Sequence, residues 1–490
     1  MAYHFTPPAG WMNDPNGFVQ YKGEYHLFYQ HHPYNTEWGP MHWGHAVSSD
    51  LVRWRHLPIA LAPSESYDEG GCFSGSAAED AEGNLVLVYT GHAPNHVQSV
   101  AAGDGLVETL VEGKGEEPRE IKPHQVQCAA VSEDGVLFSK LEGNPLIGEP
   151  PAEGSVEFRD PKVWRSASGW NMVVGTAKDG MGKAVLYRSQ ELTSGWEYVG
   201  VVSQSDGSKG SMWECPDLFE LDGRGVLLVS PMGMDGIANC TIAVVGDWDE
   251  QAGKLAEQSW THLDYGSDYY AAQSLLDDRG RRIVIAWMDM WGAAMPSAAH
   301  GWAGSMTLPR QLSWFEDGAL CVAPVEELQQ LRGAGRCLQG LEAASGALSL
   351  PELAGDVMEF IAEFDLKRSD ASRFGLELRR SEDGTERTVL VYERSSGRLS
   401  IERHGPVELA SPRNSYVVQP RGAEAPGVLR LQVFLDRSSI EVFVNGGRAA
   451  MTARLYAKPD SVGFRLFAES GRAAVPSLQA WPLSVAMDRA

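Results

Sequence analysis

Cationic side chains are scarce in this chain. Its 490 residues include 41 Lys and Arg against 65 Asp and Glu, which gives a formal net charge of −24. Binding to nucleic acid or to an anionic membrane needs clustered positive charge. We therefore expect neither as a partner, whereas a neutral small molecule is compatible with an acidic surface.

Long apolar runs and paired cysteines are also missing. No stretch approaches the roughly 18–20 apolar residues that cross a bilayer. Residues 1–8 have no basic segment followed by an apolar one, so we expect no signal peptide and a cytoplasmic protein. The cysteines form no CxxC pair, which predicts free buried thiols instead of disulfides or a zinc site. They are Cys72, Cys128, Cys215, Cys240, Cys321 and Cys337.

Helical periodicity is nearly absent before residue 325. Short apolar or alternating runs are instead separated by turns rich in Gly, Asp, Asn and Pro, a pattern typical of all-β proteins. Residues 46–51 lead to Trp54, and the similar residues 186–192 lead to Trp196. The second of these segments and two weaker echoes, at residues 130–135 and 244–248, recur roughly every sixty residues, which fits a four-stranded propeller blade with long loops. The residues alone leave a propeller and a series of repeated hairpins both open.

Length and a change of pattern near residue 325 predict two domains. A chain of 490 residues exceeds what one hydrophobic core usually supports. Residues 324–332 contain the one clear short helix, and the Gly- and Ala-rich stretch 333–346 reads as a linker. We expect a first domain over residues 1–325, a helix and linker over 326–346, and a second domain over 347–490.

The second domain is predicted to consist of strands as well. Residues 357–366 and 374–379 alternate like half-buried strands. Residues 429–435 and 440–444 read as a hairpin around the turn Asp436-Arg437-Ser438-Ser439.

Three carboxylates stand in unusual settings, each close to a proline and a bulky aromatic residue. Asp14 lies in the turn Asp-Pro-Asn-Gly, in which proline fixes φ and glycine accepts a positive φ. Asp160 lies in Phe-Arg-Asp-Pro, and Glu214 lies in Trp-Glu-Cys-Pro-Asp. One such acid is equally well explained by a turn. Three rigidly presented acids with aromatic neighbours indicate glycoside chemistry, which uses paired carboxylates.

These three motifs, in this order, resemble those of glycoside hydrolase family 32, which contains invertases, fructanases and sucrose-6-phosphate hydrolases. The resemblance covers nearly the whole chain. It implies an all-β fold, with a five-bladed β-propeller followed by a β-sandwich, and an active site at one end of the propeller's central channel. Further matching motifs are Trp43–Ser48, Phe73–Ser76, Tyr89–Gly91, Asp268–Ala271, Gly301–Gly304, Leu308–Arg310 and Asp436–Phe443.

The resemblance implies a role for each acid. Asp14 would be the nucleophile, Glu214 the general acid/base, and Asp160 a stabiliser of the oxocarbenium-like transition state. The local sequence agrees, because Arg159 next to Asp160 favours the ionised carboxylate. Glu214 stands between Trp213 and Cys215, so we expect it to be the acid most shielded from water and able to hold a proton.

Matching motif positions imply a set of sugar contacts around one fructosyl unit. Amide side chains would bind hydroxyl groups, and aromatic rings would cover the apolar edges of the sugar. With 15 tryptophans in the chain, packing in the core is the competing interpretation for each aromatic residue. The implied contacts are Asn13, Gln30, Trp38, Phe73, Ser74, Arg159 and Trp287.

The predicted function is a retaining exo-β-fructofuranosidase that acts on sucrose and short fructo-oligosaccharides through a covalent fructosyl-aspartate. A sucrose-6-phosphate hydrolase, or a fructosyltransferase that uses the same residues, remains open. A carbohydrate-binding protein without activity is disfavoured, because a binder needs no nucleophile paired with a proton donor.

Dense histidines near the amino end raise the question of a metal. Neighbouring strand positions point to opposite faces, and no spacing matches a zinc pattern. Residues 333–338 lack the third glycine of a dinucleotide-binding loop. We expect no metal and no cofactor, and a homo-oligomer is left open. The histidines are His26, His31, His32, His42 and His45.

Overall fold

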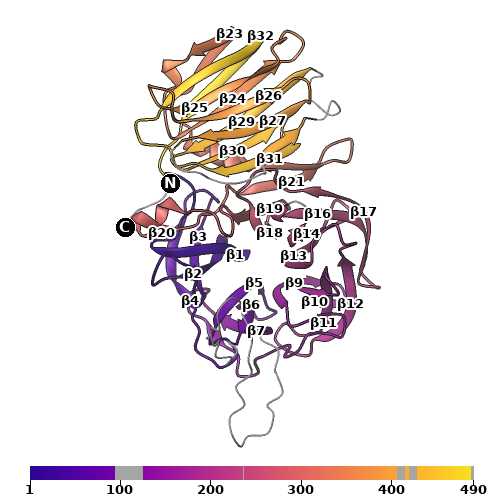
Figure 1. The fold of residues 1–490 in the computed structure, drawn as a ribbon. Helices are drawn as coiled ribbons and strands as arrows, with labels where there is room; N and C mark the ends of the chain where they lie inside the picture. Colours follow the sequence, from indigo (N-terminus) through magenta and orange to yellow (C-terminus); the bar gives the residue numbers. More distant parts are fainter. Residues whose placement is uncertain (94–124, 235–236, 406–413, 419–426, 487–490) are drawn as a thin grey trace, which may run out of the picture.

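Six β-sheets account for nearly all regular structure in the computed structural model, which describes residues 1–93, 125–234, 237–405, 414–418 and 427–486. Five small sheets form a ring, and one large sheet lies beyond it (Figure 1). The fold is therefore a five-bladed β-propeller followed by a β-sandwich-like sheet. The all-β prediction is confirmed.

Each propeller blade is an antiparallel sheet with four main strands. In chain order the first two blades are β1 (Gly10–Tyr21), β2 (Glu24–His32), β3 (His42–Ser48) and β4 (Arg55–Leu61), then β5 (Gly71–Glu79), β6 (Leu85–His92), β7 (Gln125–Ser132) and β8 (Ser139–Lys140). The third is β9 (Phe158–Ser166), β10 (Gly169–Lys178), β11 (Met181–Ser189) and β12 (Glu197–Gln204). The fourth and fifth are β13 (Met212–Leu221), β14 (Arg224–Met234), β16 (Ile242–Asp249) and β17 (Lys254–His262), then β18 (Tyr270–Leu276), β19 (Arg282–Trp287), β21 (Arg310–Trp314) and β22 (Leu320–Pro324).

Middle strands of the blades are buried on both faces, because neighbouring blades pack face to face. Residues 85–89 of β6 form a continuous apolar run, and every one of them is buried. A strand with two buried faces loses the alternation of apolar and polar residues. This explains why the sequence shows short apolar runs as often as alternating ones.

The ring closes through its innermost strands β1, β5, β9, β13 and β18, each of which contacts the next (Figure 1). Two short strands lie outside the four-strand pattern: β15 (Ile237–Asn239) pairs with β14, and β20 (Trp302–Ala303) pairs with β1. The pairing of β1 with β20 joins the first blade to a segment that follows β19 in the chain. The amino-terminal strand therefore helps to close the ring.

Buried side chains bridge the innermost strands. Gln273 of β18 donates from Nε2 to the carbonyl oxygen of Gly75 in β5 (2.6 Å) and accepts from the backbone N–H of Phe18 in β1 (3.1 Å). Lys162 of β9 pairs with Asp217 of β13 (Nζ to Oδ2, 3.0 Å). These contacts tie the innermost strands of neighbouring blades to one another.

The second domain is built on a single sheet of ten strands. Its longest strand is β32 (Gly463–Pro482). The first residues of β32 pair with β25 and its last residues pair with β24, so this strand connects the two parts of the sheet. The other strands are β23 (Arg336–Ser349), β24 (Met358–Asp365), β25 (Arg373–Arg380), β26 (Arg387–Glu393), β27 (Arg398–His404), β28 (Ser415–Val417), β29 (Val428–Asp436), β30 (Ser439–Val444) and β31 (Ala449–Arg454).

Three short 3-10 helices complete the described structure: η1 (Pro296–His300), η2 (Glu326–Leu331) and η3 (Pro351–Leu353). The predicted short helix corresponds to η2, and the predicted hairpin is the pair β29 and β30. The linker prediction is wrong for most of residues 333–346. From residue 336 onward they belong to β23, which pairs with β32 and packs half-buried leucines on the core, although intervening Gly and Ala conceal this pattern in the sequence.

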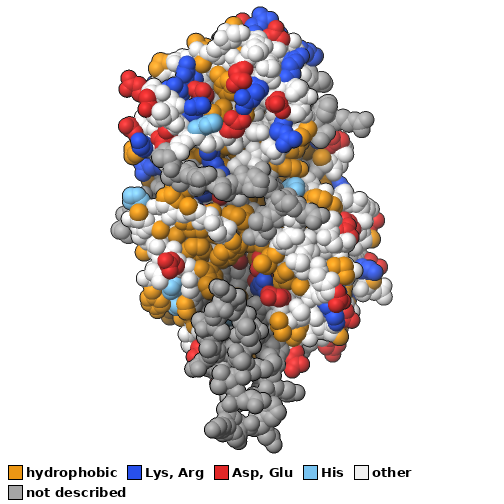
Figure 2. Space-filling view, viewed as in Figure 1, with side chains coloured by type: hydrophobic (Ala, Val, Ile, Leu, Met, Phe, Trp, Pro, Cys, Tyr) orange, Lys and Arg blue, Asp and Glu red, His pale blue; other side chains and the backbone are white. Residues whose placement is uncertain are grey.

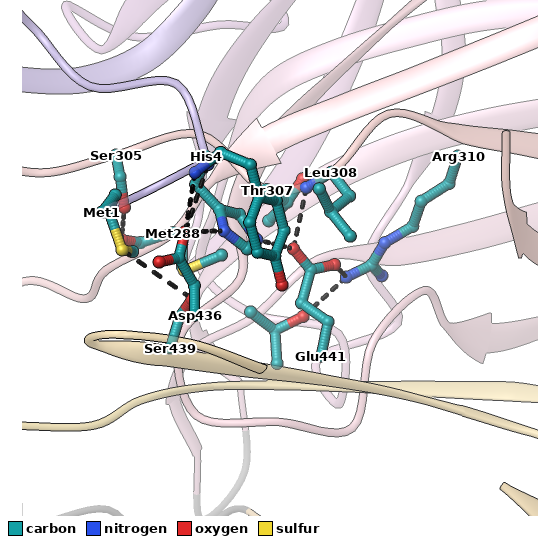
Figure 3. Close-up of polar contacts among 12 residues, drawn as sticks. Met1, His4, Met288, Ser305, Thr307, Leu308, Arg310, Asp436, Ser439 and Glu441 are labelled. Carbon is teal, nitrogen blue, oxygen red and sulfur yellow. Dashed lines mark hydrogen bonds and ion pairs between the residues drawn. The ribbon is translucent and has the colours of Figure 1, made fainter. Parts of the chain in front are cut away.

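Buried charges join the sandwich to the propeller (Figure 3). His4 is paired with Asp436 (Nδ1 to Oδ2, 2.9 Å) and with Glu441 (Nε2 to Oε1, 3.0 Å). Arg310 donates to Glu441 (2.6 Å) and to Asp264 (2.8 Å), and none of these side chains is exposed. Burial opposes a charged imidazole, but hydrogen bonds to both carboxylates raise the pKa of His4. We call this set of five residues the interface cluster.

The surface differs between the two domains. Figure 2 shows Lys and Arg interspersed with Asp and Glu over the sandwich, whereas hydrophobic side chains gather over much of the visible propeller face. In the described part of the chain, no helix is long and apolar enough to cross a membrane. The six cysteines, all of which lie in described residues, form no disulfide, but Cys337 is exposed. The prediction of burial is therefore wrong for Cys337, which lies on β23.

Candidate active site

Each innermost strand brings one polar side chain to the same end of the channel. At each of these points the strand loses its register with the second strand of its blade, as in a β-bulge. A bulge redirects a side chain away from the ordinary alternation of a strand. The five side chains are Asp14 on β1, Ser74 on β5, Asp160 on β9, Glu214 on β13 and Tyr270 on β18.

Backbone strain accompanies these bulges. Asp160 and Cys215 adopt positive φ angles of 66° and 49°. Non-glycine residues with positive φ are uncommon and cost free energy, so they cluster where function requires an exact side-chain direction. A proline follows both residues, and because it has no N–H, it loses no hydrogen bond where the ladder is interrupted.

Asp14 is held by neutral donors. Ser74 donates from Oγ to Oδ2 (2.6 Å), and Asn13 donates from Nδ2 to Oδ1 (3.1 Å). Asn13 is itself fixed, since its Oδ1 accepts from Trp11 Nε1 (2.7 Å). Burial raises the pKa of Asp14, the hydrogen bond from Ser74 opposes this shift, and the charge of Glu214 adds to it.

Asp160 is the most shielded acid of the three, with 6% of its surface exposed. The backbone N–H of Cys215 donates to its Oδ2 (2.9 Å). Burial raises the pKa of Asp160 to about 7, although the neighbouring Arg159 lowers it. Arg159 thus favours the ionised carboxylate, as the sequence indicates, but the desolvation of Asp160 outweighs this nearby charge.

The guanidinium of Arg159 donates its hydrogen bonds to Glu214, although Arg159 is next to Asp160 in the sequence. Arg159 donates to Oε1 from Nε (3.0 Å) and from Nη2 (2.9 Å), and the hydroxyl of Tyr270 donates to Oε2. The Glu214 side chain is 18% exposed. The prediction that it is the most shielded acid is thus wrong, because its apolar neighbour Trp213 is buried in the blade while Glu214 faces the opening.

Cys215 lies between two of the acids. Its Sγ is 3.6 Å from Asp14 Oδ2 and 3.6 Å from Asp160 Oδ2. Burial and the charge of Asp160 raise the pKa of the thiol, so it remains neutral. The thiol and backbone N–H of Cys215 thereby hold two carboxylates side by side without neutralising either.

The predicted sugar contacts divide into exposed and buried groups. The Trp38 ring is 48% exposed and meets Phe73 edge-on at 6.1 Å. Gln30 is 2% exposed and donates from Nε2 to the carbonyl oxygen of Cys72 (3.0 Å). These residues lie on the first two blades, next to Asn13 and Ser74.

Trp287 has no exposed surface. It packs against Trp11 (6.1 Å between ring centroids) and Trp291 (5.0 Å). Trp291 is 37% exposed and stacks on Trp11 at 5.9 Å, so it presents the exposed ring of this group. The packing interpretation therefore holds for Trp287, and sequence reasoning missed Trp291.

Sequence reasoning also missed Tyr270 and Cys215 as partners of the acids. Tyr270 belongs to the Asp268–Ala271 motif, which was noted only as a family match. Among the histidines, His26 and His45 contact each other (3.0 Å). Within the residues that the structure describes, no three His, Cys, Asp or Glu side chains are arranged to hold a metal ion.

Comparison with known proteins agrees with this arrangement. Residues 4–324 match the profile described as "Glycosyl hydrolases family 32 N-terminal domain", and residues 327–482 match "Glycosyl hydrolases family 32 C terminal". The chain belongs to glycoside hydrolase family 32. The family prediction is confirmed.

Relatives within family 32 are similar over most of their length. A sucrose-6-phosphate hydrolase of Escherichia coli is 41% identical, with 94% of this chain and 89% of the relative covered. A raffinose invertase of Escherichia coli is 38% identical, with 94% and 90% covered. A solved β-fructofuranosidase of Bombyx mori, in complex with sucrose, is 32% identical with a TM-score of 0.80 and 99% and 94% covered. This family 32 chain is accordingly a hydrolase of the β-fructofuranosidase type.

Proposed function

We propose that this chain is a retaining exo-β-fructofuranosidase that releases terminal fructosyl units from sucrose and short fructo-oligosaccharides. One observation carries the proposal. Acids from three of the five innermost strands meet around Cys215, which contacts Asp14 and Asp160 and directly follows Glu214. A nucleophile and a separate proton donor are the two groups that retaining hydrolysis requires.

The proposed reaction has two steps. Asp14 attacks the anomeric carbon of the fructosyl unit while Glu214 gives its proton to the glycosidic oxygen, so the leaving sugar departs with that proton and a fructosyl ester forms on Asp14. Glu214 then takes a proton from water, the resulting hydroxide attacks the anomeric carbon, and the ester bond breaks. Asp160 would accept hydrogen bonds from fructosyl hydroxyl groups throughout.

The surrounding contacts support these roles. Ser74 and Asn13 orient the Asp14 carboxylate, and Arg159 together with Tyr270 holds both oxygens of Glu214. Fixed donors of this kind keep reacting groups in position at no further cost during the reaction.

Buried bridges between the innermost strands support the exo mode. Gln273 bridges β18 to β1 and β5 by buried hydrogen bonds, and Lys162 bridges β9 to β13. A site that is closed on its inner side accommodates one terminal sugar unit and not the middle of a polymer. Trp38 and Trp291 provide exposed rings near the opening.

A second candidate is hydrolysis of sucrose 6-phosphate, which the printed name of the Escherichia coli relative favours. Fructosyl transfer would use the same acids. Measuring kcat/KM for sucrose, sucrose 6-phosphate, kestose and inulin under one condition separates the hydrolytic candidates. Early inulin digestion should release fructose alone, and NMR of the first product should show retained anomeric configuration. An early ladder of oligosaccharides or an inverted product would refute the proposal.

A further inference from the structure

We propose that Glu157 is a specificity-determining residue that favours a neutral leaving sugar over a phosphorylated one. This inference rests on the proposed function, because it assumes that Glu214 protonates the leaving group. It assigns the choice between sucrose and sucrose 6-phosphate to one carboxylate at the opening of the site.

Glu157 is coupled to the proposed proton donor through a single guanidinium. Its Oε2 accepts from Arg159 Nη1, while Nε and Nη2 of the same guanidinium donate to Glu214 Oε1. The Glu157 side chain is 51% exposed, whereas that of Arg159 is 10% exposed. Glu157 therefore presents a solvent-accessible negative charge directly beside the proton donor.

The leaving sugar must lie on this side of the site. A proton donor has to contact the glycosidic oxygen, so the leaving group is next to Glu214 and the fructosyl unit is next to Asp14. Sucrose 6-phosphate carries its phosphate on the glucosyl half, which is the leaving group. The phosphate dianion would therefore approach the carboxylate of Glu157.

Arg159 does not offset this repulsion. Its Nε and Nη2 donate to Glu214, and its Nη1 donates to Glu157 and to Gln125 Oε1 (3.2 Å). The guanidinium is thus already committed to protein acceptors. Sugar hydroxyl groups can donate to the exposed carboxylate of Glu157, and Met232, which is 38% exposed and contacts Arg159 Nη2 through Sδ (3.7 Å), offers apolar surface to a sugar ring.

Glu157→Gln tests the inference, because glutamine keeps the size of the side chain and an oxygen that accepts from Arg159. The kcat/KM ratio of sucrose 6-phosphate to sucrose should rise roughly fivefold. The reason is that the repulsion between the Glu157 carboxylate and the phosphate of the leaving sugar is removed. In the wild type, added salt should raise the same ratio, because screening weakens the repulsion. Glu157→Lys should raise it further.

Glu153→Gln is the matched control. Glu153 is exposed four residues earlier, and it interacts with Tyr198 on the outer strand β12. The same loss of charge there should leave the ratio unchanged.

Each outcome decides between roles. If Glu157→Gln changes kcat/KM for both substrates by the same factor, Glu157 only positions Arg159 and the inference is overturned. A wild-type preference for sucrose 6-phosphate overturns it as well. If the wild type hydrolyses neither substrate, the proposed function fails first.

Discussion

The propeller centre, by which we mean Asp14, Asp160 and Glu214 with their hydrogen-bond partners, buries carboxylates, and so does the interface cluster. The two sites stabilise these carboxylates in opposite ways. At the centre, Asp14 and Asp160 lie close to each other and to Glu214, and their pKa values are raised by burial. At the interface, burial also acts on Asp436 and Glu441, but their pKa values are lowered by His4 and Arg310. Buried acids that are matched by cations serve the fold, whereas buried acids crowded together and held mainly by neutral donors are poised for chemistry.

The largest effect is expected from removing the acids of the propeller centre. Asp14→Ala should lower kcat/KM for sucrose by at least about 10⁴-fold, because no other group can form the covalent intermediate. Glu214→Ala should also be nearly inactive on sucrose. An aryl fructoside needs less protonation of its leaving group, so it should partly rescue Glu214→Ala and not Asp14→Ala.

Circular dichroism and thermal melting provide the control for these two variants. Both should retain the fold, since Asp14 is held by neutral donors and Arg159, the partner of Glu214, keeps a second carboxylate partner in Glu157. Equal rescue of both variants by the aryl substrate would show that the two roles are wrongly assigned.

The next effect is expected at the interface cluster. Glu441→Gln leaves Arg310 and His4 buried with one fewer anion, which should destabilise the protein by about 3–5 kcal/mol. Because the pKa of Glu441 is lowered in the folded state, its contribution is present above its ordinary pKa and is lost as pH falls. The loss of stability should therefore be large near neutral pH and shrink in acid, as followed by urea unfolding.

Activity distinguishes this variant from those at the centre. At a temperature where Glu441→Gln remains folded, its kcat for sucrose should match the wild type. A large fall in kcat without unfolding would mean that the two clusters are coupled.

A smaller effect of opposite sign is expected for Asp160→Asn. The folded state raises the pKa of Asp160 to about 7, so its contribution to stability is fully present below the ordinary pKa and is lost as pH rises through about 7. The amide avoids this loss, so the variant should be more stable than the wild type by roughly 1–3 kcal/mol above neutral pH. Sucrose hydrolysis should nevertheless be lost.

Melting temperatures between about pH 5 and pH 8 measure this difference. The gain of Asp160→Asn should grow as pH rises from about 5 to about 7 and then level off, because the folded wild type ionises this acid at about pH 7. A variant that is less stable than the wild type at every pH would mean that Asp160 is held by favourable interactions, as the interface acids are.

The same contrast explains what the sequence could predict. Asp14, Asp160 and Glu214 were found because each lies in a local motif whose proline and aromatic neighbours are visible in the sequence. The hydrogen-bond partners and the burial of these acids could not be predicted in the same way. The guanidinium of Arg159 donates hydrogen bonds to Glu214, which lies 55 positions away on the next blade, and not to the adjacent Asp160.

Long-range pairing set the limits elsewhere as well. His4 and Asp436 are separated by 432 positions in the sequence, so no local sequence pattern could predict the interface cluster. Residues 336–346 read as a linker because their strand character comes from pairing with β32 near the other end of the domain. Trp287 and Trp291 are both aromatic residues near the site, and only packing decides that the first is buried and the second exposed.

The smallest effect concerns the neutral donors that distinguish the centre from the interface. The Tyr270 hydroxyl donates to Glu214 Oε2, so Tyr270→Phe should lower kcat/KM for sucrose by about tenfold, the value of one hydrogen bond to a charged group. We expect the loss in kcat more than in KM, because the hydroxyl positions the Glu214 carboxylate. The neighbouring Tyr269 offers a matched control, because it is equally buried and its hydroxyl has no hydrogen-bond partner in the described residues. Tyr269→Phe should leave both kcat and KM unchanged. If Tyr270→Phe reduces stability without lowering kcat, the hydroxyl serves packing alone, and the neutral donors at the centre would be no different in role from the ion pairs at the interface.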